Sequence, residues 1–277
     1  MYAVLASVTN NIAYQLVSQY DIMNIASQAI RLKVVGKTEA RLVENTRENE
    51  MTISDMEKST KTRNIEKPAK AGRALTKREQ REASIEKILS SSLKLFISKG
   101  YRSTTVDEIA GSSQLTKGAV YFYFPTKAAI LFALLDEIDD LMVNKMVDRV
   151  ANAGSLLQDK LIAFIHGQSV LGIDKAEFVL LFILMLMEFN GSNDEIEARV
   201  KDIYKRFYLS IEEIVHRGKL NGEFRTDLET QEIAAIVLAM HNGTFLEWYC
   251  RSDYLSGPEL VRALRGTLLT GILKKPA

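Results

Sequence analysis

The order of apolar and polar positions predicts a chain made of helices. After Thr76, apolar residues recur every three or four positions up to Gly100, which is the period of an amphipathic helix with a glycine stop. Further apolar-periodic stretches follow the polar residues Ser155, Asp174, Asn193, Thr230 and Ser256. No run alternates apolar and polar residues as a half-buried strand does. We therefore predict an all-α fold.

Two short helices are predicted directly after the first long one. Thr105 and Glu108 have the spacing of a capping box, which opens a helix of about two turns. Thr116 is placed to cap a second short helix, and Pro125 prevents that helix from continuing. Two short helices joined by a tight turn, behind a longer helix, are typical of a helix-turn-helix DNA-binding unit.

The chain divides into three predicted parts. Residues 1–75 show little periodicity and end in a polar, basic stretch, which indicates an N-terminal extension and basic linker, disordered in part. Residues 76–127 hold the helix-turn-helix domain, and residues 128–277 are predicted to form a helical regulatory and dimerisation domain. Whether residues 1–50 belong to the natural protein stays open, because Met51 and Met56 stand at the start of the linker.

The charge is balanced in total and uneven along the chain. The formal net charge is +1, yet nine Lys and Arg residues stand against three Glu residues between Lys58 and Glu82. Such an arm suits a phosphate backbone, or is a solvated linker, and both readings stay open. Cys250 is the only cysteine, which excludes an intrachain disulfide and fits a reducing cytoplasm. The longest apolar run, Phe178 to Met187, is much shorter than the roughly 20 residues of a membrane span. We therefore expect a cytoplasmic protein with no membrane partner.

The second short helix has the composition of a helix that reads DNA. Residues 116–124 read Thr-Lys-Gly-Ala-Val-Tyr-Phe-Tyr-Phe, and no acid occurs between Glu108 and Asp136. Successive residues on a helix point about 100° apart, so the three aromatic residues 121–123 cannot all face one core. At least one of them is predicted to be exposed.

These residues resemble the signature of the TetR family of regulators, together with Thr105, Ile109 and Ala110 before them and Lys127 after them. The resemblance implies a homodimeric repressor that binds a palindromic operator in double-stranded DNA and is released by a small molecule. By the same resemblance, phosphates are contacted by Thr104 or Thr105, Tyr121, Tyr123 and Lys127. Base edges are approached by Thr116, Lys117, Gly118 and Phe122.

The chain also departs from the family pattern in the turn. Ser113 and Gln114 stand where the family usually has Ala-Gly, so a residue other than glycine has to adopt the turn conformation.

The helices after Ser155 are rich in Met and aromatic residues. Such residues suit a cavity for a small apolar or amphipathic ligand, although they are more often plain core. The ligand-binding candidates are His166, Phe182, Met185, Glu188, His241, Phe245 and Trp248. Apolar stripes also run along residues 231–273, where the resemblance implies the homodimer interface.

A helical-bundle enzyme or metal-binding protein without DNA function is the alternative. Such a protein needs a nucleophile with its base, a phosphate loop or a metal cluster, and the sequence shows none of these. The three histidines, His166, His216 and His241, lie far apart in sequence. We predict no catalytic residue, no metal and no cofactor.

Overall fold

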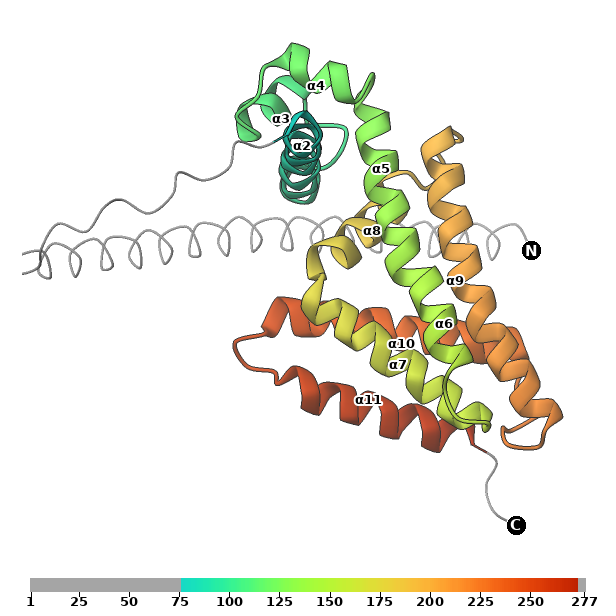
Figure 1. Ribbon diagram of the computed structural model, residues 1–277. Helices are drawn as coiled ribbons and strands as arrows, with labels where there is room; N and C mark the ends of the chain where they lie inside the picture. Colours follow the sequence, from blue (N-terminus) through green and yellow to red (C-terminus); the bar gives the residue numbers. More distant parts are fainter. Residues whose placement is uncertain (1–75, 274–277) are drawn as a thin grey trace, which may run out of the picture. The chain divides into compact units, whose positions relative to one another are not determined.

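The computed structural model describes residues 76–273 (Figure 1). The extension and linker predicted over residues 1–75 lie outside the described residues, as do the last four residues. The chain divides into two units, Met1–Glu86 and Lys87–Ala277, and the site described below lies in the second. The elements are α2 (Lys77–Lys99), α3 (Val106–Ser112), α4 (Lys117–Tyr123), α5 (Lys127–Asp139), the π-helical turn η1 (Asp140–Asn144), α6 (Lys145–Ala151), α7 (Leu157–Asp174), α8 (Ala176–Glu188), α9 (Glu195–Leu220), α10 (Thr230–Arg251) and α11 (Gly257–Ile272).

The all-α prediction is confirmed. Within residues 76–273 the only strand-like feature is an isolated antiparallel bridge between Phe224 and Leu273. In that same range no single helix is long and apolar enough to cross a membrane, although α4 and the helix after it reach the required length and composition together, across a bend of 54°.

Side-chain caps start several helices where the sequence predicts them. Thr105 and Glu108 form the complete capping box of α3, and Thr116 accepts a hydrogen bond from Ala119 N at 3.1 Å to begin α4. Thr126 caps α5 in the same way.

The start of α7 differs from the sequence pattern. The sequence predicts a helix directly after Ser155, but α7 begins at Leu157 without a side-chain cap of its own. The Glu223 carboxylate takes that role, accepting from Leu157 N at 2.8 Å and Gln158 N at 3.2 Å.

The core of the regulatory helices lies where α9 packs against α5, α7, α8 and α10 (Figure 1). α9 packs along α10, and α11 packs against α10 and α7. Ile130, Leu135 and Ile138 of α5 are fully buried, and the rings of Phe164 and Phe207 are 5.3 Å apart. These contacts fix the helix that leads directly out of the helix-turn-helix.

A π-helical turn interrupts this connecting helix. Just before η1, the Asp139 carboxylate accepts hydrogen bonds from Arg199 and Arg206 of α9. Inside η1, the carbonyl oxygen of Met142 accepts from Gln168 Nε2 of α7 at 3.3 Å. Two neighbouring helices thus hold the turn, and π-helical turns are frequent at functional sites.

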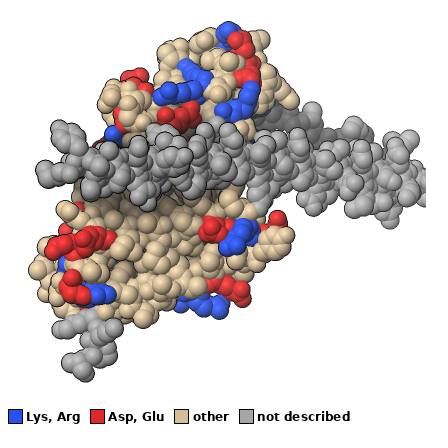
Figure 2. All heavy atoms as spheres, turned by 180° about the vertical axis from the view of Figure 1, so that it is seen from behind, with Lys and Arg blue, Asp and Glu red and all other residues tan. Residues whose placement is uncertain are grey.

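The surface differs between the two regions of the chain (Figure 2). On the face shown there, Lys and Arg side chains alternate with Asp and Glu around the helix-turn-helix, in the upper part of the view. The regulatory helices below present a broad surface with few charges.

Candidate nucleic-acid interface

The short helices α3 and α4 are anchored by a few buried apolar side chains. Ile109 of α3 and Val120 of α4 are fully buried, as are Ile88 and Phe96 of α2. Because Val120 faces inward, the residues on either side of it along the helix point outward. Val120 therefore sets the orientation of α4, with its opposite face toward solvent.

The turn between α3 and α4 adopts a left-handed conformation at a residue other than glycine. Gln114 has φ 57°, and its amide donates to Gly111 O at 3.2 Å, while Leu115 N donates to Ala110 O at 2.9 Å. These two bonds form a Schellman motif, which usually has glycine at this position. The sequence-based expectation for Gln114 is confirmed.

Two aromatic side chains of α4 are exposed to solvent. Phe122 is 79% exposed and Tyr121 is 44% exposed, whereas Tyr123 is half-buried, with its ring 5.1 Å from that of Phe122. An exposed phenylalanine beside an exposed tyrosine contributes nothing to the core of the protomer. Together they form a surface suited to contact with another molecule.

The start of α4 is polar and open. Thr116, Lys117 and Gly118 are all exposed. Around Gly118, a Cβ atom would meet only the Thr116 hydroxyl, at 4.0 Å. The backbone of α4 is therefore accessible at its first turn, where its amide groups point outward.

Lys117 forms an ion pair that the sequence analysis did not anticipate. Its Nζ lies 2.7 Å from Asp107 Oδ2 of α3, and both side chains are largely exposed. The hydrogen bond with Asp107 raises the pKa of Lys117. Asp107 thus holds the ammonium in place, and a phosphate or base acceptor has to compete with this carboxylate. Exposed pairs of this kind are weak, so the competition costs little.

Lys127 is held by backbone carbonyls. Its Nζ donates to Tyr101 O and to Thr104 O, each at 2.8 Å, and lies 4.2 Å from the centre of the Tyr101 ring. Partial burial lowers the pKa of Lys127, although Glu188 and Glu108 favour its charge. The resemblance implied a phosphate contact here, whereas these contacts give Lys127 a structural role in the DNA-free protein.

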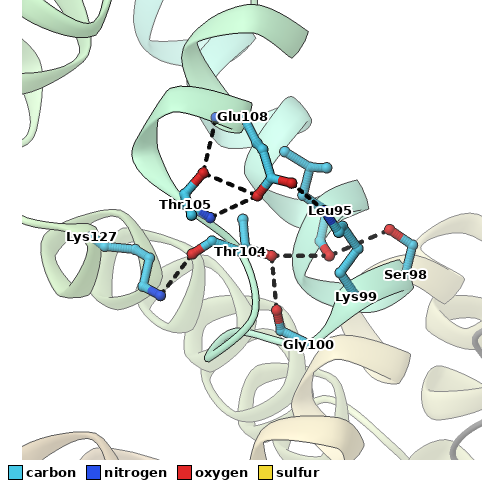
Figure 3. A network of polar contacts seen from close by, with 8 residues as sticks. All are labelled: Leu95, Ser98, Lys99, Gly100, Thr104, Thr105, Glu108 and Lys127. Carbon is cyan, nitrogen blue, oxygen red and sulfur yellow. Dashed lines mark hydrogen bonds and ion pairs between the residues drawn. The ribbon is translucent and has the colours of Figure 1, made fainter.

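Thr104 and Thr105 have different surroundings (Figure 3). Thr104 is 1% exposed, and its hydroxyl donates to Gly100 O at 2.8 Å, so it is not available to DNA in this conformation. Thr105 is exposed, and its hydroxyl accepts from Glu108 N at 3.3 Å. Lys99 pairs with the Glu108 carboxylate, and this hydrogen bond, with those from Thr105, lowers the pKa of Glu108 to about 2. Of the two threonines, Thr105 is therefore the candidate for a phosphate contact.

Glu188 was expected in a ligand cavity and lies elsewhere. Its carboxylate oxygens accept hydrogen bonds from Arg102 N at 2.8 Å and from Tyr101 N at 3.1 Å. It therefore binds the loop between α2 and α3 and does not line the cavity between α7, α10 and α11. No sequence signal connects these positions, because Arg102 and Glu188 are 86 residues apart.

Three of the ligand-binding candidates line one cavity between α7, α10 and α11. His241, Phe245 and Trp248 surround a space of about 30 Å³ with Gln168 and Leu264. Complete burial lowers the pKa of His241 to about 4, so its imidazole is neutral near pH 7. Phe182 and Met185 are buried core residues of α8 and do not line this cavity, and His166 is exposed.

Gln168 is the residue of this cavity that the sequence analysis missed. It is 1% exposed, and its Oε1 is buried without a hydrogen-bond partner, while its Nε2 bonds to η1. A buried unpaired carbonyl oxygen is unfavourable, so it is an available acceptor for a donor that enters the cavity.

Comparison with known proteins places this arrangement in a family. Residues 88–134 match the sequence profile of bacterial regulatory proteins of the tetR family, and residues 135–261 match that of the C-terminal region of YsiA-like protein. The crystal structure of the MbdR regulator from Azoarcus sp. CIB is 44% identical, with a TM-score of 0.63; the match covers 69% of this chain and 100% of that one. The chain belongs to the TetR family.

Two further similar proteins, both described as transcriptional regulators, differ in how much of their length is matched. The uncharacterized HTH-type transcriptional regulator YuxN of Bacillus subtilis is 43% identical over 61 residues, which are 22% of this chain and 21% of YuxN. The match thus spans about a fifth of that relative. FadR from Bacillus subtilis, solved with stearoyl-CoA, is 22% identical over 68% of this chain and 98% of its own, with a TM-score of 0.55. The similarity to FadR therefore shows that the two proteins share a fold.

Family membership decides between the two functions considered from sequence. TetR-family proteins are DNA-binding transcription regulators, and the chain is one of these rather than an enzyme. The family match over residues 88–134 contains the segment from Thr104 to Lys127 in which the DNA-contacting residues were predicted. Within residues 76–273, no cluster of three or more His, Cys, Asp or Glu side chains is arranged to hold a metal ion.

Proposed function

We propose that this TetR-family regulator represses transcription by binding a palindromic operator as a homodimer, and that a small molecule releases it. The observation that carries the DNA-binding part is the surface of α4. A helix without acidic residues presents Lys117, Tyr121 and Phe122 to solvent, and its first turn is open. A helix of this kind fits the major groove, which presents acceptors on base edges and methyl groups on thymine.

The exposed residues of this surface divide into two roles. Thr105, Tyr121 and Tyr123 carry hydroxyl groups suited to phosphate oxygens, which fix the position of a protein on the duplex. Thr116, Lys117, Gly118 and Phe122 are proposed to approach base edges. Lys117 then exchanges Asp107 for a base or phosphate acceptor, and Phe122 supplies an apolar contact for a thymine methyl group.

The homodimer interface is proposed on α10 and α11. Both helices have an exposed face of small residues, and at Gly243, Gly266 and Gly271 an added Cβ atom would meet nothing within 4 Å. On α10 this face includes the half-exposed Ile236. Small residues beside an exposed apolar one allow the backbones of two copies to approach closely. A two-fold dimer then reads two half-sites about one helical turn apart, near 34 Å.

The ligand is proposed to enter the cavity beside Gln168 and His241. The lining is mainly apolar, and the polar groups include the unpaired Gln168 Oε1 and a neutral imidazole. These features favour an apolar or amphipathic molecule that carries a hydrogen-bond donor. The structure of FadR with stearoyl-CoA supports this class of ligand in a protein of the same fold.

Ligand binding at this cavity requires side chains to move. A space of about 30 Å³ corresponds to roughly one or two water molecules. A larger ligand therefore has to displace neighbours such as Trp248, and the displacement is a means of favouring a second conformation. To turn a population from 99:1 to 1:99, the ligand must prefer the released state by about 5.5 kcal/mol.

Selection of bound sequences from a random DNA library tests this proposal. The expected result is a two-fold symmetric sequence whose half-sites are about one helical turn apart. The full chain should bind it with an affinity that falls as salt rises, because cations are released from phosphates. Recovery of no preferred sequence, or of an asymmetric single site, would contradict the proposed dimeric repressor.

A further inference from the structure

The loop between α2 and α3 is bound by the end of α8. The two oxygens of Glu188 accept hydrogen bonds from two successive backbone amides, those of Tyr101 and Arg102. Because each amide meets a different oxygen, the carboxylate restrains the direction of the loop as well as its distance. Hydrogen bonds to an ionised acceptor are roughly twice as strong as neutral ones.

Phe189, the next residue, strengthens the same contact. Its ring lies 5.4 Å from that of Tyr101, edge to face, and the Arg102 guanidinium lies 5.6 Å from its centre. Phe189 and Tyr101 are both buried. Glu188 thus binds the backbone amides of Tyr101 and Arg102, and Phe189 contacts the side chains of the same two residues.

The loop is also held from the side of α5. Lys127 Nζ bonds to the carbonyl oxygen of Tyr101, and Glu188 is a charge that acts on Lys127. The Tyr101 backbone is therefore bonded at both of its polar groups. Its amide donates to Glu188 at the end of α8, and its carbonyl oxygen accepts from Lys127 at the start of α5. These two attachments connect the loop to the end of α8 and to the first residue of α5.

We propose that Glu188 and Phe189 form a joint, called here the α8 joint, which sets the angle of α4 relative to the regulatory half. The inference rests on the proposed dimeric operator binding, because the angle of α4 affects DNA binding only when two recognition helices must enter two half-sites at once. In this role Glu188 and Phe189 position α4 without touching DNA.

A rigid joint predicts strict half-site spacing. One base pair added between half-sites moves them apart by about 3.4 Å and rotates one against the other by roughly 35°. Recognition helices held by the α8 joint cannot follow this change. Helices released from it can adjust, so loss of the joint should relax spacing discrimination while leaving the base contacts of each half-site unchanged.

The experiment compares binding to the selected operator with binding to the same operator carrying one inserted base pair. For the full chain, insertion should weaken binding by about tenfold or more, and for Glu188→Ala by less than about threefold. Glu223→Ala is the matched control, because Glu223 also accepts two backbone amides but binds the start of α7. The control should keep the discrimination of the full chain.

A second variant keeps the test informative if Glu188→Ala folds poorly. Glu188→Gln has nearly the same shape, but its amide group turns a donor toward one of the two loop amides. It should show the same relaxed spacing. If Glu188→Ala and Glu188→Gln both discriminate between the operators as strongly as the full chain, the α8 joint is wrong and dimeric operator binding stands. If the full chain selects no DNA sequence, the proposed function and the joint both fail.

Discussion

The ammonium of Lys127 donates to the backbone carbonyl of Tyr101 at 2.8 Å and lies 4.2 Å from the centre of the Tyr101 ring. The same ammonium donates to Thr104 O, so one cation closes the loop that precedes α3. A lysine that looks like a phosphate contact in sequence is thus part of the framework that orients the helix-turn-helix. This distinction can be measured, because a contact within the protein contributes to stability, whereas a phosphate contact contributes to the salt dependence of DNA binding.

Replacing Lys127 with methionine should lower stability more than it changes the salt dependence of DNA binding. Loss of two charge-assisted bonds at a half-buried site costs roughly 2 kcal/mol. The slope of log K against log salt should stay within about half a unit of the parent value, whereas loss of a phosphate contact lowers it by about one. Thermal unfolding and a salt titration measure the two effects. A slope lower by one unit at unchanged stability would restore the phosphate assignment.

Replacing Gln114 with glycine should stabilise the protein. Gln114 has φ 57°, a conformation that costs a residue with a side chain about 1 kcal/mol and costs glycine little. Gln114→Gly should therefore raise the free energy of unfolding by up to about 1 kcal/mol. Gln114→Ala is the control, since it removes the long side chain but keeps the strain. Equal stability of the two variants would show that the turn is not strained.

His241 should make stability depend on pH below neutrality. Its pKa is about 4 in the folded protein and about 6.5 when unfolded, so the unfolded chain binds more protons between these values. Stability from this group is present above pH 6.5 and is lost as the pH falls toward 4. From pH 8 to pH 5 the loss is about 2 kcal/mol.

His241→Leu should remove most of this dependence in denaturant titrations at the two pH values. The carboxyl groups of Glu108 and Glu197 have pKa values lowered to about 2. Their contribution to stability is therefore lost at a lower pH than the contribution of His241. An unchanged pH dependence in His241→Leu would contradict the burial of a neutral imidazole beside the cavity.

Replacing Gly243 with arginine should dissociate the proposed dimer into monomers. Gly243 is exposed on α10 with open space around it, so Gly243→Arg fits the protomer but blocks close approach of a second copy. Sedimentation should show a monomer with unchanged helical content. Leu220→Arg, at an exposed apolar position near the end of α9, should remain a dimer. A dimeric Gly243→Arg variant would place the interface elsewhere.

Local rules predicted the fold and the surface of α4, and they failed where distant segments meet. Capping spacing located the start of α3 at Thr105. The angle between successive helical residues required at least one exposed aromatic side chain, and both Phe122 and Tyr121 are exposed. The partner of Glu188 could not be predicted, because the loop that it binds is set by packing between α8 and the helix-turn-helix. The sequence predicts His166 of α7 as a ligand-binding residue, but His166 is exposed. Gln168, two positions further and roughly 200° around the helix, lines the cavity instead.

The most direct test of the central claim is operator binding by α4 variants, measured by fluorescence anisotropy on the selected sequence at physiological salt. Lys117→Ala and Tyr121→Phe should each weaken binding by about tenfold, because each loses one contact to DNA. Their thermal transitions should match that of the full chain, since both side chains are exposed or largely so. Lys205→Ala, at an exposed lysine of α9, should bind like the full chain. If Lys117→Ala and Tyr121→Phe also bind like the full chain, α4 is not the helix that reads DNA.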